Sequence, residues 1–207
     1  GNLSTNGLDA GREVFTVFRA GTPHGDAAIR TWLSWMRQIV SVLDDTMLAE
    51  RFSDLEARMP RTESVSVVVD SPLWHNLKVA LADQFCEQVL SGTERVDELI
   101  VTAPYYDETG DALGRLLTRL APGRVTIYTA ASSQVDGTKL AARLAAADAD
   151  VQAFVYLPEA FTHAKLLGAV SGNRGWLLSG SANLSNAALT FSGGPAGSGN
   201  VELAVFA

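Results

Sequence analysis

The fold is decided by the stretch 96-VDELIVTAPYYDETGDALGRLLTRLAPGRVTIYTA-130, which reads as a strand, a helix and a second strand. Residues 99–103 are mostly apolar and are followed by a proline and two tyrosines, which is typical of a buried strand and the turn after it. Residues 112–121 carry leucines at the three- and four-residue spacing of a helix face. The turn 107-DETGD-111 can cap that helix, and 124–130 returns to a buried-strand pattern. The stretch therefore predicts one β-α-β unit.

The same alternation continues on both sides of this unit. A second helix is expected over 138–149 and a third strand over 151–157. Turns rich in glycine, serine and asparagine divide further expected strands, at 162–170, 175–180 and 200–206, and 192–200 is a loop by composition. Upstream we expect strands at 13–18 and 64–70, a helix at 25–49, a surface connection at 50–63 and a helical region at 73–91. Such a pattern predicts an α/β fold with a mixed β-sheet flanked by helices on both faces.

Composition excludes several classes of protein. Hydrophobic residues make up 47% and charged residues 19% of the 207 residues, which suits a soluble core, and no apolar run reaches the roughly 20 residues that span a bilayer. A single cysteine, Cys86, excludes an internal disulfide, and the three histidines lack metal-ligand spacing, so no metal or cofactor is expected. A net charge of −7 argues against a strongly basic polyanion clamp but leaves a local basic groove open. The default location for such a chain is cytoplasmic.

Polar residues interrupt the apolar pattern in 163-HAKLLGAVSGNRGWLLSGSANLS-185. His163 and Lys165 share one face of an expected strand, because alternate side chains point the same way. Burying an imidazole and an ammonium together is costly unless an anion satisfies both. A phosphate would do so, and the Gly-Ser-Ala-Asn turn offers Ser181, Asn183 and backbone N–H groups to the same oxygens. The alternative is a core histidine satisfied by its neighbours.

The combination of these motifs resembles the phospholipase D superfamily, whose signature is H-x-K-x4-D-x6-G-S-x-x-N or its G-S-x-N form. The matching residues here are His163, Lys165, Gly180, Ser181 and Asn183. The resemblance covers about half the chain, over 96–206, and implies one phospholipase D-like lobe. Glu202 fits the acidic residue that members place behind the histidine.

One departure from the signature concerns its aspartate. Asn173 stands at the aspartate position, seven residues before Gly180, and the span from Lys165 to Gly180 is three residues longer than the signature. A hairpin turn lengthened at 171–175 would accommodate the extra residues. The alternative is that Asn173 is simply a turn residue.

The first residues, 1-GNLSTNGLDAGREVFTVF-18, resemble the tail of the same motif. Asn2 would correspond to Asn183, and Glu13 approximately to Glu202. Two-lobed members of the superfamily repeat the motif and hold the active site between lobes. The resemblance thus implies three regions: the tail of a first lobe at 1–20, a helical connection with a further strand at 21–95, and a second lobe at 96–207. A chance match over a short stretch is the alternative.

The resemblance also implies a mechanism. In the family a neutral imidazole attacks phosphorus and forms a phosphohistidine, while a second histidine protonates the leaving oxygen and then activates water. Lys165 and Asn183 would stabilise the charge on the phosphate oxygens with help from Ser181, and Glu202 would orient His163. The second His-x-Lys motif would come from upstream sequence or from a homodimer partner. By family habit the first histidine is more often the nucleophile, which would make His163 the general acid.

Three functions fit these residues. We expect a metal-independent nuclease acting on DNA or RNA, and the alternatives are a phospholipase D-type lipid hydrolase or a catalytically degenerate lobe that binds nucleic acid or protein. Substrate contacts are expected from Ser181, Asn2, Glu13 and Tyr105, whose ring would stack on a base at the edge of the sheet unless it serves only packing. The helix arginines are expected on solvated faces: Arg115, Arg119 and Arg143.

Overall fold

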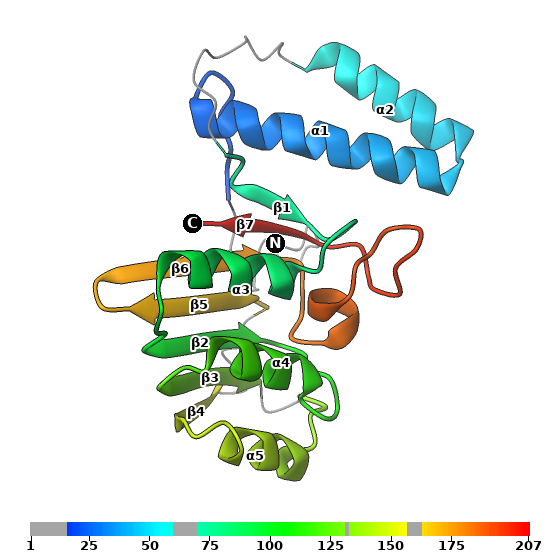
Figure 1. Cartoon of the computed structure of the whole chain (residues 1–207). Coiled ribbons are helices and arrows are strands. Elements are labelled where there is room, and N and C mark those ends of the chain that lie inside the picture. Colours follow the sequence, from blue (N-terminus) through cyan, green and yellow to red (C-terminus); the bar gives the residue numbers. More distant parts are fainter. Residues whose placement is uncertain (1–15, 60–69, 131–132, 157–162) are drawn as a thin grey trace. The chain divides into compact units, whose positions relative to one another are not determined.

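The computed structural model of the chain describes residues 16–59, 70–130, 133–156 and 163–207. The chain divides into two compact units, Thr16–Trp74 and a unit that contains His75–Ala207. The second unit holds the central β-sheet and the candidate site (Figure 1).

The smaller unit is built on a helical hairpin. Helices α1 (Pro23–Leu43) and α2 (Thr46–Arg58) pack against each other. Trp32 meets Phe52 edge to face, with ring centroids 6.3 Å apart, and the Arg37 guanidinium pairs with Glu56. The aromatic pair lies in the seam where the two amphipathic helices meet.

This hairpin corrects two sequence predictions. The single helix expected over 25–49 is broken at Asp44, whose φ of 49° is left-handed and ends α1. Asp45 then accepts a hydrogen bond from the Leu48 amide and starts α2 as its N-cap. The surface connection expected over 50–63 is wrong as far as residue 58, because α2 continues to there, and residues 60–63 lie outside the described ones.

The sheet has seven strands in the order β1-β7-β6-β5-β2-β3-β4. Their bounds are β1 (Leu73–His75), β2 (Glu98–Ala103), β3 (Arg124–Ala130), β4 (Asp150–Tyr156), β5 (Leu166–Ser171), β6 (Arg174–Gly180) and β7 (Leu203–Phe206). Strands β2, β3 and β4 are parallel, whereas β5 is antiparallel to β2, and β6 and β7 continue antiparallel. The sheet is therefore mixed, and the α/β prediction is confirmed.

The β-α-β-α-β pattern read from the sequence is present. Helix α4 (Asp111–Leu120) connects β2 to β3, and α5 (Gly137–Ala145) connects β3 to β4. Helices α3 (Leu81–Gly92) and α4 cover the same face of the sheet (Figure 1). Fully buried side chains fill the layer between them: Phe85, Leu99, Val101, Leu113, Leu116 and Val125.

The predictions for the strands and the helix upstream of residue 92 are partly wrong. The helical region expected over 73–91 begins with strand β1, and its helix starts only at Leu81. The reason is Asn76, which is fully buried and donates to the carbonyls of Phe191 and Asn200 at 3.2 and 2.7 Å, so that this turn is fixed by a distant loop. Residues 16–18 of the strand expected at 13–18 are not in a strand, and the rest of that strand lies outside the described residues, as does 64–69.

Candidate functional site

The site lies at the edge of the sheet where β6 ends and β5 begins. Strand β5 starts at Leu166, so His163 and Lys165 precede the strand on which they were expected. The cause is Pro104, which follows β2 and has no N–H to extend the ladder with β5 beyond Thr102 and Leu166.

A close approach of backbones brings β5, β6 and β7 together at this edge. The amide of Gly180 donates to the carbonyl of Lys165 at 3.3 Å, and Gly180 also pairs with Ala204 of β7. A Cβ atom at Gly180 would lie 2.3 Å from the Leu203 carbonyl oxygen and 2.6 Å from the Ala204 Cα. Only glycine fits there, which explains the first residue of the Gly-Ser-x-Asn motif.

Lys165 and His163 form the centre of the site. The Lys165 side chain is only 8% exposed, and its Nζ atom lies 3.2 Å from Nδ1 and 3.1 Å from Nε2 of His163. The same ammonium donates to the His163 carbonyl at 3.0 Å. Since an ammonium has only donors, the imidazole nitrogen that accepts from it must have a free lone pair. The contact suits a neutral imidazole.

Ser181 and Glu202 form the second pair at this edge. The Ser181 hydroxyl donates to the carboxylate of Glu202, which is 6% exposed, and accepts from the Leu203 amide at 3.1 Å. The Asn200 side chain lies 3.4 Å from the same carboxylate. The sequence predicts a hydrogen bond from His163 to Glu202, and that bond stays a prediction.

Asn76 holds the backbone of Glu202 in place. Its Oδ1 atom accepts from the Glu202 amide at 2.8 Å, while its Nδ2 atom binds the loop carbonyls described above. Sequence reasoning missed this positioning residue. A lone asparagine after an aromatic strand has no local pattern that indicates long-range contacts.

Asn183 contributes an amide whose oxygen has no partner. Its Oδ1 atom is buried and makes no hydrogen bond within the described part of the chain. Buried polar atoms are nearly always paired, and the oxygen and nitrogen of a side-chain amide are exchangeable by a flip. This oxygen makes the Asn183 amide a candidate for a ligand contact.

Tyr105 and Tyr106 close the same edge of the sheet. The Leu184 amide donates to the Tyr105 carbonyl at 3.2 Å, which joins the end of β2 to the residue after Asn183. The Tyr105 side chain is 47% exposed, whereas Tyr106 is buried and donates to the Tyr128 carbonyl at 3.1 Å. Burial, followed by the neighbouring Tyr156, raises the pKa of Tyr106, so its phenol stays protonated. Tyr105 is the tyrosine within reach of a bound molecule.

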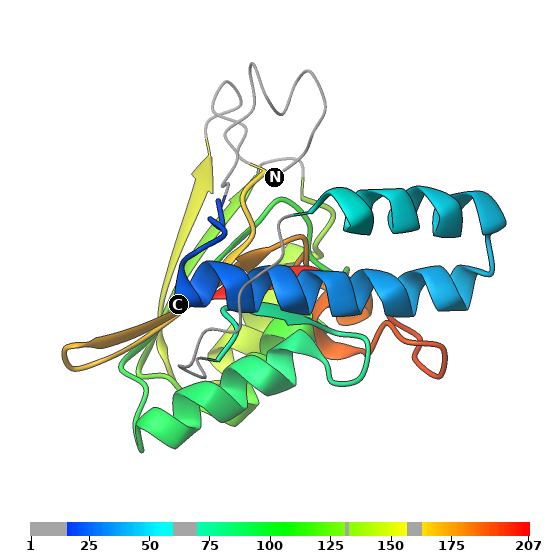
Figure 2. The ribbon, with the colours of Figure 1, turned by 90° about the horizontal axis from the view of Figure 1, so that it is seen from above.

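Asn173 lies at the other end of the β5–β6 hairpin. Ser171 pairs with Arg174, so the turn consists of Gly172 and Asn173 alone and protrudes from the sheet (Figure 2). The lengthened turn expected at 171–175 is thus wrong, because the extra residues lengthen the strands instead. Six residue pairs separate this turn from the start of β5, roughly 20 Å at strand spacing. Asn173 is a turn residue remote from the site.

Other expected site features are placed as follows. Asn2 and Glu13 lie outside the described residues. Within the described ranges, no cluster of three or more His, Cys, Asp or Glu side chains is arranged to hold a metal ion. No helix of the described part has the length and apolarity needed to cross a membrane. The candidate site consists of His163, Lys165, Ser181, Asn183 and Glu202, with Tyr105 near the same edge.

Comparison with known proteins gives structural likenesses only. No protein-family model matches the chain, and no curated protein matches it. Solved structures that match include Nuc from Salmonella typhimurium, a phospholipase D family member, with a TM-score of 0.40 and 15% identity over 65% of this chain and 79% of that one. Polyphosphate kinase from Porphyromonas gingivalis matches with a TM-score of 0.38 and 10% identity over 77% of this chain and 23% of that one.

A third match is TrmBL2, an archaeal chromatin protein, with a TM-score of 0.30 and 14% identity over 86% of this chain and 59% of that one. Likenesses of this degree do not establish function. Fold and site together define an α/β protein with a His-x-Lys and Gly-Ser-x-Asn constellation at one edge of a mixed sheet.

Proposed function

We propose that this chain supplies one half-site of a metal-independent phosphodiesterase that hydrolyses DNA or RNA through a phosphohistidine intermediate. The observation that carries the proposal is the buried Lys165 ammonium lying against the imidazole of His163. The Asn183 side chain lies at the same edge, and its amide N–H group could donate to a phosphate oxygen.

The chemistry needs two imidazoles. One attacks phosphorus and forms an N–P bond, while the other donates a proton to the leaving oxygen. Water then attacks phosphorus, gives its proton to the second imidazole and breaks the N–P bond, so that both histidines are restored. His163 takes one of these roles, and a second His-x-Lys motif takes the other. Lys165 stabilises the non-bridging oxygens throughout.

A nucleic-acid substrate is favoured over a lipid by Tyr105. Its ring is about half exposed at the same edge as Asn183, where it can stack on a base. A lipid headgroup offers no planar surface to such a ring. Hydrolysis of phosphatidylcholine vesicles in preference to DNA would contradict this choice of substrate.

The substitution His163→Asn tests the site. The protein should cleave bis(p-nitrophenyl) phosphate and single-stranded DNA in excess EDTA, and the variant should lose at least about 1,000-fold in rate, because a member of the covalent machinery is removed. His24→Asn is the matched control, since His24 is exposed on α1. Retained activity in the His163 variant would refute the site, and loss of activity in EDTA would refute metal independence.

A further inference from the structure

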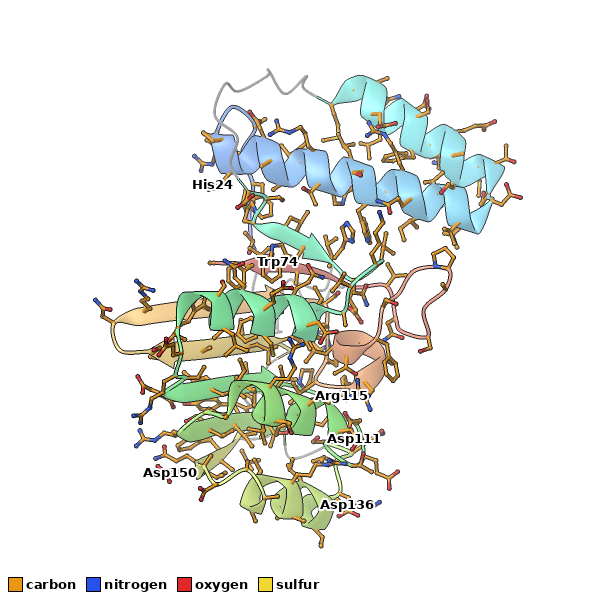
Figure 3. All side chains as sticks on the ribbon, viewed as in Figure 1. His24, Trp74, Asp111, Arg115, Asp136 and Asp150 are labelled. Atoms are coloured by element: carbon orange, nitrogen blue, oxygen red, sulfur yellow. The ribbon has the colours of Figure 1, made fainter. Side chains whose placement is uncertain are left out.

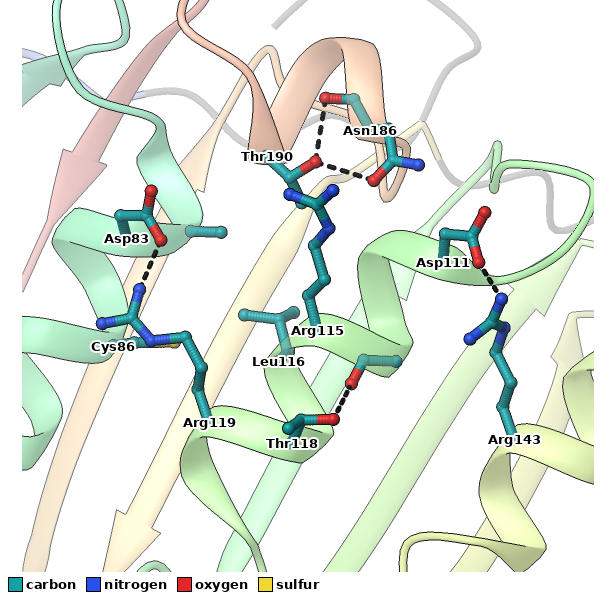
Figure 4. A pocket seen from close by; sticks show the side chains of 12 residues that line it. Asp83, Cys86, Asp111, Arg115, Leu116, Thr118, Arg119, Arg143, Asn186 and Thr190 are labelled. Carbon is teal, nitrogen blue, oxygen red and sulfur yellow. Dashed lines mark hydrogen bonds and ion pairs between the residues drawn. The ribbon is translucent and has the colours of Figure 1, made fainter.

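A groove of about 660 Å³ lies between α3, α4 and the π-helical turn η3 (Asn186–Thr190), with Arg143 of α5 at one side. This volume falls in the range of small-ligand sites, about 300–1,000 Å³. Figure 4 shows three arginines along it. They were expected on solvated helix faces; Arg115 and Arg119 are exposed as expected, and the structure also brings all three together along this groove.

Two of the three arginines are neutralised by carboxylates. Arg119 pairs with Asp83 of α3, and Arg143 pairs with Asp111 at the start of α4. Both pairs join one helix to another, so they hold the walls of the groove. Cys86 also lines the groove, but burial raises the pKa of its thiol to about 11, so it is no nucleophile at neutral pH.

Arg115 differs from Arg119 and Arg143 in the groups that surround its guanidinium. Among the described residues no carboxylate pairs with it, and its guanidinium carbon lies 5.6 Å from the ring centroid of Phe191. It projects from α4 beside η3 (Figure 3), and Figure 4 shows it pointing towards Asn186 and Thr190. A guanidinium held over a ring keeps its donors free for an anion. Among the described arginines that line the groove, Arg115 is thus the one without a carboxylate partner, although the whole chain is acidic.

The groove and the candidate site share a segment of chain. Asn186 and Thr190 follow Asn183 by a few residues, and the Thr190 hydroxyl donates to the Asn186 side chain at 2.7 Å. Asn76 links the two more tightly, because it binds the Phe191 carbonyl with Nδ2 and the Glu202 amide with Oδ1. The backbone of Phe191, whose ring lies against Arg115, and the backbone of Glu202 are thus held by one buried side chain.

We infer that this groove binds the backbone of a single-stranded nucleic acid on one side of the scissile bond, with Arg115 contacting a phosphate. The inference rests on the proposed function for the identity of the chain that enters the groove. Phosphate contacts from arginine position a strand without reading its sequence. A groove of this volume holds a few groups of one strand, and Arg115 lines it.

The test compares Arg115→Ala with Arg124→Ala in the full chain. Arg124 is also exposed, but it pairs with Asp150 at the opposite end of the parallel strands. Binding of a fluorescent oligothymidylate is measured by anisotropy in EDTA across a series of salt concentrations. Arg115→Ala should weaken binding about five- to tenfold and reduce the slope of log K against log salt by about 0.7, the value for one phosphate contact on a single strand. Arg124→Ala should change neither.

Hydrolysis of bis(p-nitrophenyl) phosphate separates this inference from the proposed function, because that substrate has no flanking strand. The parent and Arg124→Ala should hydrolyse it equally. Unchanged oligonucleotide binding and salt slope in Arg115→Ala would overturn the groove assignment, whatever the hydrolysis. Selective loss of binding with no hydrolysis by any of the three would overturn the proposed function and leave the groove assignment standing. Arg115→Glu, with its thermal melting checked against the parent, should weaken binding further than Arg115→Ala.

Discussion

His163 and His75 show how residue surroundings decide what a histidine can do. His163 has the Lys165 ammonium against its ring at the open edge of the sheet. His75 ends β1, and its Nδ1 atom is buried with no partner in the described part of the chain. Burial, and then the positive charge of Lys78, lower the pKa of His75 below 6.5. His75 is therefore a neutral structural residue whose protonation opposes folding.

This lowered pKa predicts a loss of stability in acid. The unfolded chain binds a proton at His75 before the folded protein does, so the contribution is fully present above the unfolded pKa of 6.5 and is lost as pH falls below it. The free energy of unfolding in urea, measured at about pH 7.5 and about pH 5.5, should fall less in His75→Phe than in the parent. His24→Phe is the matched control on an exposed side chain. An equal fall in His75→Phe and the parent would contradict the prediction.

The grouping of the candidate site residues could be predicted from their spacing in the sequence. The residue that holds the backbone beside them, Asn76, could not. His163, Lys165 and the Gly-Ser-x-Asn turn are close in sequence, so the strand period and one hairpin bring them to the same edge. Asn76 acts across more than 100 residues of chain. Contacts of that kind leave no periodic pattern in a single sequence.

Among the elements, α4 lines the groove, and its start is held by Asp107. The Asp107 carboxylate accepts from the amide of Asp111 at 2.5 Å and from that of Ala112 at 3.0 Å. The capping turn predicted at 107–111 is confirmed by these bonds. They satisfy amides at the helix start that would otherwise lack partners.

Asp107→Ala should lower the free energy of unfolding by about 1 kcal/mol, the usual cost of losing a side-chain cap. Asp107→Asn keeps an oxygen that can accept, so it should lose less. Urea denaturation followed by circular dichroism measures both. Equal stability of Asp107→Ala and the parent would show that α4 is held by its buried leucines alone.

Helices and strands that are set by signals near in the sequence were predicted well, and those that depend on distant contacts were not. Residues 124–130 form β3 as expected, and α4 differs from its expected range by one residue at each end, because leucine spacing and the Pro-Gly stop are local signals. Strand β1 and the turn η3 were missed. Both depend on the loop that Asn76 binds, so the chain around them is shaped by distant contacts.

At the scale of the whole molecule, the chain has one His-x-Lys motif and the proposed chemistry needs two histidines. His24 and His75 are the remaining histidines of the sequence, and neither is followed by lysine at the second position. The pKa of His75 is lowered by burial and by the charge of Lys78, which suits a structural residue. We propose that the second catalytic histidine comes from another copy of the chain, and the alternative is a second His-x-Lys motif within one chain.

A mixing experiment tests this requirement. In a two-fold pair with one shared site, only pairs of two intact chains hold both histidines. Parent and His163→Asn chains, unfolded together in equal amounts and refolded, should therefore have roughly one quarter of the parent's activity on bis(p-nitrophenyl) phosphate. If both histidines lay within one chain, the mixture would keep roughly one half of the parent's activity, because each parent chain would then be active by itself. An equal mixture of parent and His24→Asn, treated in the same way, should keep full activity. If the activity instead falls in proportion to the fraction of parent chains in the mixture, the shared site is contradicted. Both histidines would then lie in one chain.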